Sequence, residues 1–489
     1  MNIGVHHIIG ATLALCSATG NAAQLSVDDT LAKARSSDQQ YISWHEHIID
    51  DPVSAQVPFN GSDGLAMADL DLDGLIDIVS VHESDSGYDS AIHDADLKVP
   101  LEGHVRIAFA TADPKIWTNI TLAEGSAVAA PEDVAIGDVN GDTYPDVLVA
   151  AELGHLIYLQ NPGSEARSEP WPRRILPMTQ NQGSYLRVFF ADFNNDGQLE
   201  ATTANKGAQR PGPKDYARST PVSLLQVNGD PLASDGWAQT LLGHYSIPQN
   251  AEPVDLDQDG DMDIVIGSRG EQRIAWFENV SKAGNLQFKE HAIGIIGAQI
   301  SGFNLTYADI NRDQRLDIIG ASTQALYWLE QPAVIDDGWL AHKIGTFIPD
   351  SITGLVAADI NDDGHLDIMA GSYSRGTRTA EQDAQVDEPL GRLGWFENPG
   401  AKNENWMRHD ISRRKRGMFD KFIARDMDAD GDMDFVSTRG NSGQLDGVFW
   451  LEQVRSKEPR AAFTAARLND SQSMPLPRVG TKKAGRSPL

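Results

Sequence analysis

Seven copies of a nine-residue acidic pattern run through the chain and are the residues best suited to chemistry. Each copy has Asp at the first position, Asp or Asn at the third, Asp at the fifth, and Asp or Glu at the ninth. In a tight turn these side chains direct oxygen atoms inward, and the seventh residue adds a backbone carbonyl. An all-oxygen cage of this kind is what Ca²⁺ prefers. The pattern therefore predicts seven calcium loops.

The predicted ligands are four side chains from each loop, and 24 of these 28 are carboxylates. They are Asp69, Asp71, Asp73 and Asp77; Asp138, Asn140, Asp142 and Asp146; Asp192, Asn194, Asp196 and Glu200; Asp255, Asp257, Asp259 and Asp263; Asp309, Asn311, Asp313 and Asp317; Asp359, Asn361, Asp363 and Asp367; and Asp426, Asp428, Asp430 and Asp434. Polar β-turns also favour Asp, Asn and Gly. Carboxylates clustered this densely, however, repel one another unless a cation lies among them. We expect weak affinities, about 10⁻⁴–10⁻³ M, as in extracellular modules.

Two loops depart from the pattern. Most copies have Gly at the sixth position, where it permits a left-handed turn. The fifth loop has Gln314 there, and the second has Gly141 at the fourth position with Thr143 at the sixth. We expect the fifth loop to be the emptiest site.

The loops recur at intervals of 50 to 69 residues, which indicates one structural unit with insertions. A short apolar run precedes each loop and another follows it, without helical periodicity, so each loop should join two strands. An aromatic strand comes next, as at 274–279, 325–331, 393–400 and 448–453, and then a segment that begins with Trp, as at 117, 339 and 406. Four strands in each unit predict the blade of a β-propeller.

We predict an all-β fold, a seven-bladed propeller over 43–453. The seventh unit ends near Gln453 without its Trp segment, while 44–49 supplies such a segment with no unit before it. An N-terminal strand that completes the last blade would close the ring and leave no open edge.

The chain ends and the composition limit the classes of function. Residues 1–23, with an apolar run at 8–15, are typical of a signal peptide, so we expect a secreted, periplasmic or cell-surface protein. Residues 24–42 form a lead, and the basic segment 454–489 is expected to be disordered. The net charge of -30 argues against nucleic acid, no later stretch is apolar enough to span a membrane, and we expect a monomer. The single cysteine, Cys16, excludes a disulfide framework.

The acidic loops and the WFEN strands resemble the FG-GAP or VCBS repeat propellers, whose best-known members are the integrin α-subunit heads. The WFENPG and Trp-x-x-His elements are more similar to bacterial VCBS proteins and to the propeller of fungal aldos-2-ulose dehydratase. The resemblance implies a propeller fold and calcium, and it implies an activity far less.

The candidate ligand face is the one opposite the acidic loops. Its predicted ligand-binding residues are His82, Arg269, Tyr373, Arg375 and Arg439. Guanidinium groups and hydroxyls there would suit an anionic or hydroxyl-rich ligand. The alternative is that these strand ends are simply solvated. The long connection at 82–102, with its His and acidic residues, could hold a second metal or be a solvated loop.

Two hypotheses of function follow from the sequence. The first is a binding module for a carbohydrate or a protein. The second is a carbohydrate lyase or dehydratase that uses His82, Tyr88, His93 or Tyr373 with Arg375 or Arg439. No motif fixes an acid–base pair, so no catalytic residue is identified and the first hypothesis is favoured.

Overall fold

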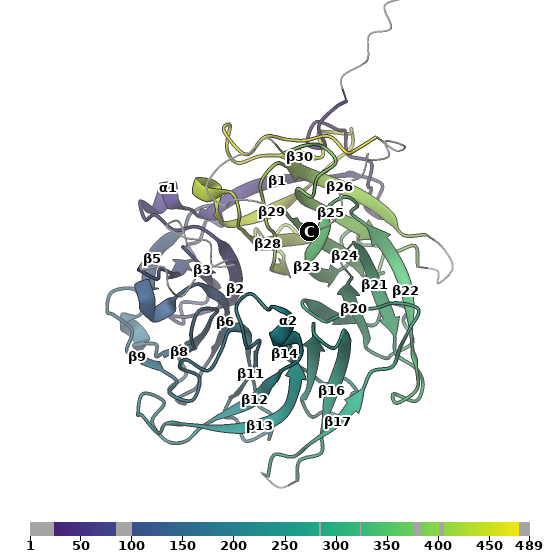
Figure 1. The fold of residues 1–489 in the computed structure, drawn as a ribbon. Coiled ribbons are helices and arrows are strands. Elements are labelled where there is room, and N and C mark those ends of the chain that lie inside the picture. Colours follow the sequence, from purple (N-terminus) through teal and green to yellow (C-terminus); the bar gives the residue numbers. More distant parts are fainter. Residues whose placement is uncertain are drawn as a thin grey trace, which may run out of the picture.

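Seven antiparallel sheets surround a central channel in the computed structural model, which describes residues 24–84, 100–282, 285–322, 324–374, 384–400 and 405–478 (Figure 1). Six sheets have four strands that are consecutive in the chain, the seventh has three consecutive strands and one from the N-terminus, and two of the sheets carry a further short strand. The predicted seven-bladed propeller is confirmed.

The strands of each blade follow one another from the channel outward. The inner strands are β2 (Ser62–Ala68), β6 (Pro131–Gly137), β10 (Tyr185–Ala191), β14 (Pro248–Val254), β19 (Leu305–Ala308), β23 (Ser351–Ala358) and β27 (Phe422–Arg425). The second strands are β3 (Asp77–His82), β7 (Asp146–Ala151), β11 (Glu200–Asn205), β15 (Asp263–Ser268), β20 (Asp317–Ala321), β24 (Asp367–Tyr373) and β28 (Asp434–Arg439). The third strands are β4 (His104–Phe109), β8 (Leu156–Leu159), β12 (Ser219–Val227), β16 (Arg273–Asn279), β21 (Ala325–Glu330), β25 (Gly391–Glu397) and β29 (Gly447–Ser456). The outer strands are β5 (Thr118–Glu124), β9 (Arg173–Ile175), β13 (Trp237–Ser246), β17 (Phe288–Ala292), β22 (Trp339–Thr346), β26 (Met407–Arg414) and β1 (Tyr41–Asp50).

Helices contribute little to the fold. The described residues include α1 (Pro52–Ala55), α2 (Pro213–Tyr216) and the 3₁₀ turns η2 (Gly125–Val128), η3 (Gly163–Glu165) and η4 (Gly443–Leu445). In the part of the chain that the structure describes, no helix has the length and apolar character of a membrane span.

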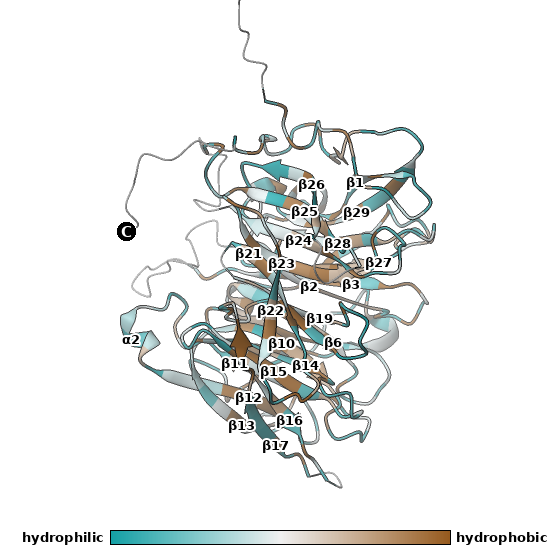
Figure 2. Ribbon diagram, turned by 90° about the vertical axis from the view of Figure 1, so that its right-hand side faces the viewer, coloured by the Kyte–Doolittle hydropathy of each residue, from teal (hydrophilic) through white to brown (hydrophobic). Residues whose placement is uncertain are grey.

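The core lies between neighbouring blades. The second strands are buried along nearly their whole length, for example at all six residues of β3, β7 and β15. Apolar residues are concentrated on the strands, as the brown segments of Figure 2 show. A strand covered on both faces needs the continuous apolar runs that the sequence has after each loop.

A Trp–His pair joins the third and outer strands in four blades. Trp276 of β16 stacks on His291 of β17 with ring centroids 4.8 Å apart, and His291 Nε2 is 2.7 Å from the Glu278 carboxylate. The same arrangement recurs with Trp328 and His342, Trp395 and His409, and Trp450 and His47. These cross-strand contacts explain why the aromatic strand and the segment carrying His occur together in the sequence.

The N-terminal strand closes the ring as predicted. β1 pairs antiparallel with β29 along its length, with Trp44 opposite Gln453, and so forms the outer strand of the last blade. In Figure 1 the purple N-terminal strand accordingly lies beside the yellow C-terminal strands. Two short strands extend outer strands in parallel: β18 (Ile295–Ile296) on β22 and β30 (Phe463–Thr464) on β1.

The prediction of a disordered C-terminal tail needs correction. Residues 457–478 pack on the N-terminal lead and on blades six and seven, whereas 479–489 lie outside the described residues. Phe463 pairs beside Trp44 and is 5% exposed, and the amide of Val27 donates to the Met474 carbonyl over 3.2 Å. The segment is basic in composition, but acidic and apolar partners from elsewhere in the chain fix it.

Candidate metal loops and ligand face

The acidic loops connect the inner strand of each blade to its second strand, as expected, and the ninth residue opens the second strand. This ninth carboxylate has a structural role that the sequence did not reveal. In the first loop, Asp77 accepts hydrogen bonds from the amide of Leu70 (3.0 Å), within the loop, and from that of Ala110 (2.8 Å), after β4. Both bonds recur at Asp146, Asp263, Asp317, Asp367 and Asp434. The ninth carboxylate thus fastens each of these loops to the third strand of its blade.

Burial raises the pKa of the ninth carboxyl groups, against the opposing effect of these backbone hydrogen bonds. The pKa rises to about 6 for Asp77 and Asp146, to about 7 for Asp263, Asp317 and Asp434, and to about 8 for Asp367. The native environment therefore disfavours the charged carboxylate, and a cation in the loop would offset that cost.

The backbone of every loop turns left-handed twice, at the fourth and the sixth residues. The sequence predicted only the second of these turns. Leu72 (φ 60°) and Gly74 (φ 89°) show the pattern in the first loop, and Gln314 (φ 69°) and Thr143 (φ 81°) follow the same path without Gly. The two irregular loops therefore keep the regular backbone, and only their side chains differ.

The identity of the third residue divides the loops into two groups. Where it is Asn, its amide donates to an acid of the same loop, as Asn361 does to Asp363 over 3.2 Å. Where it is Asp, in the first, fourth and seventh loops, no such donor is present, and three carboxylates bring oxygen atoms within 4.8 Å of one another. Buried carboxylate oxygens of Asp71, Asp255 and Asp426 have no hydrogen-bond partner among the described residues. These three loops match the hard-oxygen donor set of calcium best.

Basic side chains compensate some loops but not others. Arg315, at the seventh position of the fifth loop, pairs with Asp313 of the same loop. Arg167 pairs with Asp71 and lies 2.8 Å from Asp73 in the first loop. For the fourth loop, no ion pair with Lys or Arg occurs among the residues that the structure describes. Among the three Asp-rich loops, the fourth therefore has the greatest need for a bound cation, whereas the fifth loop has the guanidinium group of its own Arg315.

An Asn or Gln at the end of the third strand links adjacent blades, and sequence analysis did not assign it a role. Asn279 Nδ2 donates to the carbonyl of Phe193, in the loop of the preceding blade, over 2.7 Å, and to that of Met262 in its own blade. Equivalent bonds to the preceding blade are made by Asn161, Gln331, Asn398 and Gln453. The sequence feature that could have predicted this link is the Asn or Gln at the end of the WFEN and WLEQ motifs.

The structure separates the predicted ligand residues. Arg269 is exposed just after β15, and Tyr373 is half-buried at the end of β24. His82 is completely buried, and Arg439 is 2% exposed and lies 2.6 Å from Asp470 of the C-terminal segment. Neither of these two side chains can reach a surface ligand in this conformation. Arg375 lies outside the described residues, as do Tyr88 and His93.

His82 makes the free energy of unfolding depend on pH. Its ring nitrogens lie 2.7 Å from Ser62 Oγ and 3.0 Å from Ser80 Oγ, and burial, with a smaller effect of Arg106, lowers its pKa well below the ordinary value. Below about pH 6.5, His82 in the unfolded chain takes up a proton, whereas His82 in the native state stays neutral. The contribution of His82 to the free energy of unfolding is therefore fully present above pH 6.5 and is lost as the pH falls.

We therefore expect His82→Gln to flatten the acid limb of the stability profile. Native His82 should contribute a slope of up to about 1.4 kcal/mol per pH unit below pH 6.5. Urea unfolding at pH 7, 6 and 5 measures this slope, with His244→Gln, an exposed site on β13, as the control. Parallel profiles for wild type and His82→Gln would contradict the assignment.

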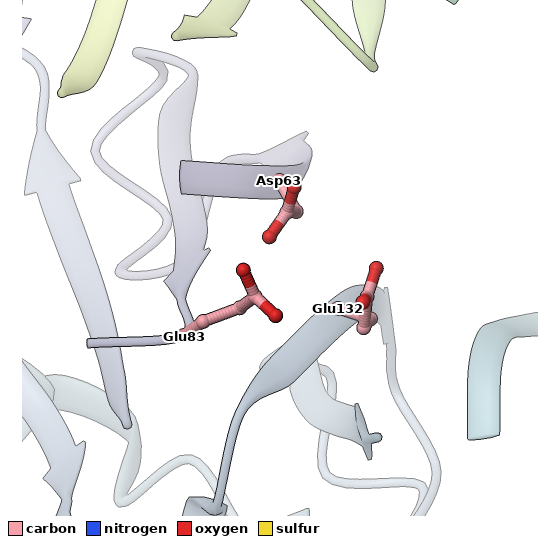
Figure 3. Close-up of side chains that lie close together, drawn as sticks. All are labelled: Asp63, Glu83 and Glu132. Carbon is pink, nitrogen blue, oxygen red and sulfur yellow. The ribbon is translucent and has the colours of Figure 1, made fainter. Parts of the chain in front are cut away.

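Three carboxylates meet at the rim of the channel, on the face opposite the acidic loops. Figure 3 shows Asp63, Glu83 and Glu132 directed toward one another, with oxygen atoms within 4.8 Å. Burial, together with Glu152 and Asp63, raises the pKa of Glu132 well above its ordinary value. Of the three, only Glu83 lies in the connection at 82–102 that the sequence indicated as a candidate site. The cluster makes this side of the rim acidic, whereas the sequence had suggested an anion-binding rim.

Arg187, Asn304 and Asp420, from three blades, form a polar crossbar across the channel. Arg187 of β10 pairs with Asp420, before β27, and also donates to Asn304 Oδ1 over 3.0 Å. Most inner strands are irregular near their first residues, as β10 is between Tyr185 and Val188. Such bulges redirect side chains, and here they turn polar residues toward the axis. Three distant blades are thereby tied together.

A family model matches part of the chain, and two solved structures are similar to most of it. A family model described as an FG-GAP-like repeat matches residues 138–201 and 255–320, and each match runs from one acidic loop through the next. No curated protein has a significant match to the chain. A chain of the S. cerevisiae core factor crystal structure is similar at 11% identity and a TM-score of 0.42; the match covers 88% of this chain and 63% of that one, less than two thirds. Ycf48 from Cyanidioschyzon merolae is similar at 9% identity and a TM-score of 0.45, over 84% of this chain and 98% of that one.

The two repeat matches and the ring of seven sheets identify the chain as a seven-bladed β-propeller that contains FG-GAP-like repeats.

Proposed function

We propose that the protein is an exported, calcium-stabilised propeller that acts as a binding module for a carbohydrate or protein ligand. The observation that carries the calcium part is the set of unpartnered buried oxygens in the Asp-rich loops, at Asp71, Asp255 and Asp426. The first, third, fifth and ninth side chains of each loop would hold the ion. Calcium would supply positive charge to the loop carboxylates that Arg167 and Arg315 do not neutralise, and it would stiffen one face of the ring.

A binding role is favoured because the chain forms a ring of seven sheets whose repeats are of the FG-GAP-like type. Such scaffolds carry many unrelated activities, so the ligand must come from the site itself. We place the ligand on the face opposite the acidic loops, where Arg269 is exposed and Tyr373 is half-buried. An acid–base reaction at His82 has no support from its buried position, and Tyr88, His93 and Arg375 of the lyase hypothesis lie outside the described residues.

Export is proposed from the apolar segment at 8–15 and from the type of calcium loop. Loops of weak affinity fill only where calcium is near millimolar, as outside the cytoplasm. Secretion, the periplasm and the cell surface all meet this condition.

Arg269→Ala tests the ligand face. We expect this variant to keep the wild-type melting temperature and to bind an anionic or hydroxylated ligand more weakly by about 1.5–3 kcal/mol, since a charge-assisted hydrogen bond is lost. Binding is measured in calcium on a panel of neutral and acidic polysaccharides and extracellular proteins. Arg173→Ala, exposed on the outer strand β9, is the control. If Arg269→Ala binds the ligand as tightly as the wild type does, the ligand does not bind on this face. If the wild-type protein binds no member of the panel, the proposal of a binding module is wrong.

A further inference from the structure

The central channel contains a cavity that the proposed ligand face does not use. It has a volume of about 390 Å³ and is lined by inner-strand residues of β2, β6, β10 and β14 and by Lys421 and Ile423. A second cavity of about 180 Å³ shares Phe189, Glu252 and Lys421 with it. The lining extends to Met262 of the fourth acidic loop, which is 41% exposed. The channel is therefore approached from the face with the acidic loops.

Asp133 brings an uncompensated carboxylate into this cavity. Its side chain is 1% exposed, and neither of its oxygens has a hydrogen-bond partner among the described residues. It lies against Gly64 of the neighbouring inner strand, where a Cβ atom would be only 2.8 Å from Asp133 Oδ1. The buried Oδ1 of Asn250, which lines the smaller cavity, is likewise unpartnered in the described part of the chain. A buried charge without a partner costs several kcal/mol, so these acceptors call for a donor.

The charges that line the two cavities leave one negative charge in excess. Arg187 and Asp420 neutralise each other in the crossbar. Asp133 and Glu252 then face a single ammonium group, that of Lys421, which lies 5.9 Å from the centre of the Phe189 ring. Burial alone would lower the pKa of Arg187, but Asp420 and Asp133 raise it, so Asp133 acts on the guanidinium without forming an ion pair with it. Burial raises the pKa of Glu252, and with that carboxylate ionised the cavities accommodate one further positive charge.

The walls around Asp133 determine what kind of cation fits. Val188, Phe190, Ala135 and Ile423 give the cavity apolar sides. A hydrated divalent metal would lose its water shell there and would find too few oxygen ligands to replace it. An ammonium group on an apolar chain gains both the carboxylate and the aromatic surface. The seven acidic loops around the entrance attract cations to it.

We propose that the central channel binds a primary ammonium group carried on an apolar carbon chain, with Asp133 as its counter-ion. The group could belong to a free amine or to a lysine side chain of a protein partner. The inference stands independently of the proposed ligand face, because it concerns different residues and the other entrance of the ring.

Calorimetric titration of the full chain in calcium tests the inference. The probes are n-butylamine and its neutral counterpart 1-butanol, together with a lysine peptide and the same peptide with acetylated lysine. We expect the amine, the unmodified peptide or both to bind, and the neutral partners not to. Binding of the amine alone identifies a small-molecule site, whereas binding of the peptide identifies a lysine-binding site.

Variants locate the binding. Asp133→Asn should weaken binding at least about tenfold, the loss expected for a hydrogen bond to a charged group, and should keep or raise the melting temperature because it removes an uncompensated buried charge. Glu252→Gln provides a second test, and the exposed Asp235→Asn is the control. Three results would overturn the inference: no binding by either ammonium probe, equal binding by Asp133→Asn and wild type, or complete competition by Na⁺ at an equal concentration.

Discussion

Removal of calcium should lower the melting temperature of the protein by about 10 °C or more. A ligand that binds only the native state stabilises it by about 2.7 kcal/mol per site at one hundred times its dissociation constant, a ratio that about 10 mM Ca²⁺ reaches for the tightest affinity expected for these loops, about 10⁻⁴ M. Three well-filled loops would thus contribute about 8 kcal/mol, the size of a typical total stability. The cause is electrostatic, because chelation leaves the loop carboxylates facing one another and the buried ninth carboxyl groups without a counter-charge.

Calorimetry in EDTA, and again after addition of excess Ca²⁺, measures this effect. The melting temperature should recover with Ca²⁺, and with Mg²⁺ it should recover only in part, because Mg²⁺ demands a tighter octahedral shell. An unchanged melting curve in EDTA would remove the calcium assignment altogether.

A matched pair of variants distinguishes the loops. Asp255 and Asp309 are the first residues of the fourth and fifth loops, and each accepts a hydrogen bond from the amide of the sixth residue, at 3.1 Å and 2.8 Å. Asp255→Asn should reduce the gain in melting temperature on adding calcium. Asp309→Asn should leave that gain unchanged, because Arg315 already neutralises Asp313 in the fifth loop. Equal losses from the two variants would show that the internal arginine does not replace the ion.

The repeats made the fold predictable. A pattern that recurs seven times averages out local ambiguity, and the apolar runs on both sides of each loop fixed the strands. The Trp-x-x-His segment at 44–47 located the closing strand, because its partner Trp450 lies in a unit that has no such segment of its own. The fold could therefore be predicted from short sequence patterns that recur in each blade.

Contacts between blades were not predictable in the same way. The Asn279 side chain reaches Phe193, 86 residues earlier, and the Arg187–Asp420 pair joins residues 233 apart. Their positions depend on the register of the blades and on irregular inner strands, which no spacing reveals. For the same reason His82 and Arg439 were expected at the rim, although neighbouring elements cover both.

The C-terminal segment was misjudged because composition counts charges without their partners. Its Phe463 and Met474 are buried, and its Asp470 carboxylate lies between two guanidinium groups of the propeller body. A basic composition indicates disorder only where no fixed partner exists, and here the last two blades supply one.

Asp470→Asn should lower the free energy of unfolding by about 3–5 kcal/mol, the cost of leaving a buried partner without its counter-ion. The Asp470 side chain is 7% exposed, pairs with Arg414 and lies 2.6 Å from Arg439. Burial and, next, the adjacent Arg414 lower the pKa of Arg439 to about 9. Without the carboxylate, two buried cations would repel each other at neutral pH.

Equilibrium urea unfolding of the full chain measures the effect, and Glu458→Gln, an exposed acid in the same segment, is the control. A chain that ends at Ser456 should lose more than Asp470→Asn, because it also lacks the packing of Phe463 against β1. If both changes leave the unfolding free energy unaltered, residues 457–478 do not brace the last two blades. If the truncated chain alone is destabilised, apolar packing rather than the ion pairs of Asp470 holds the segment in place.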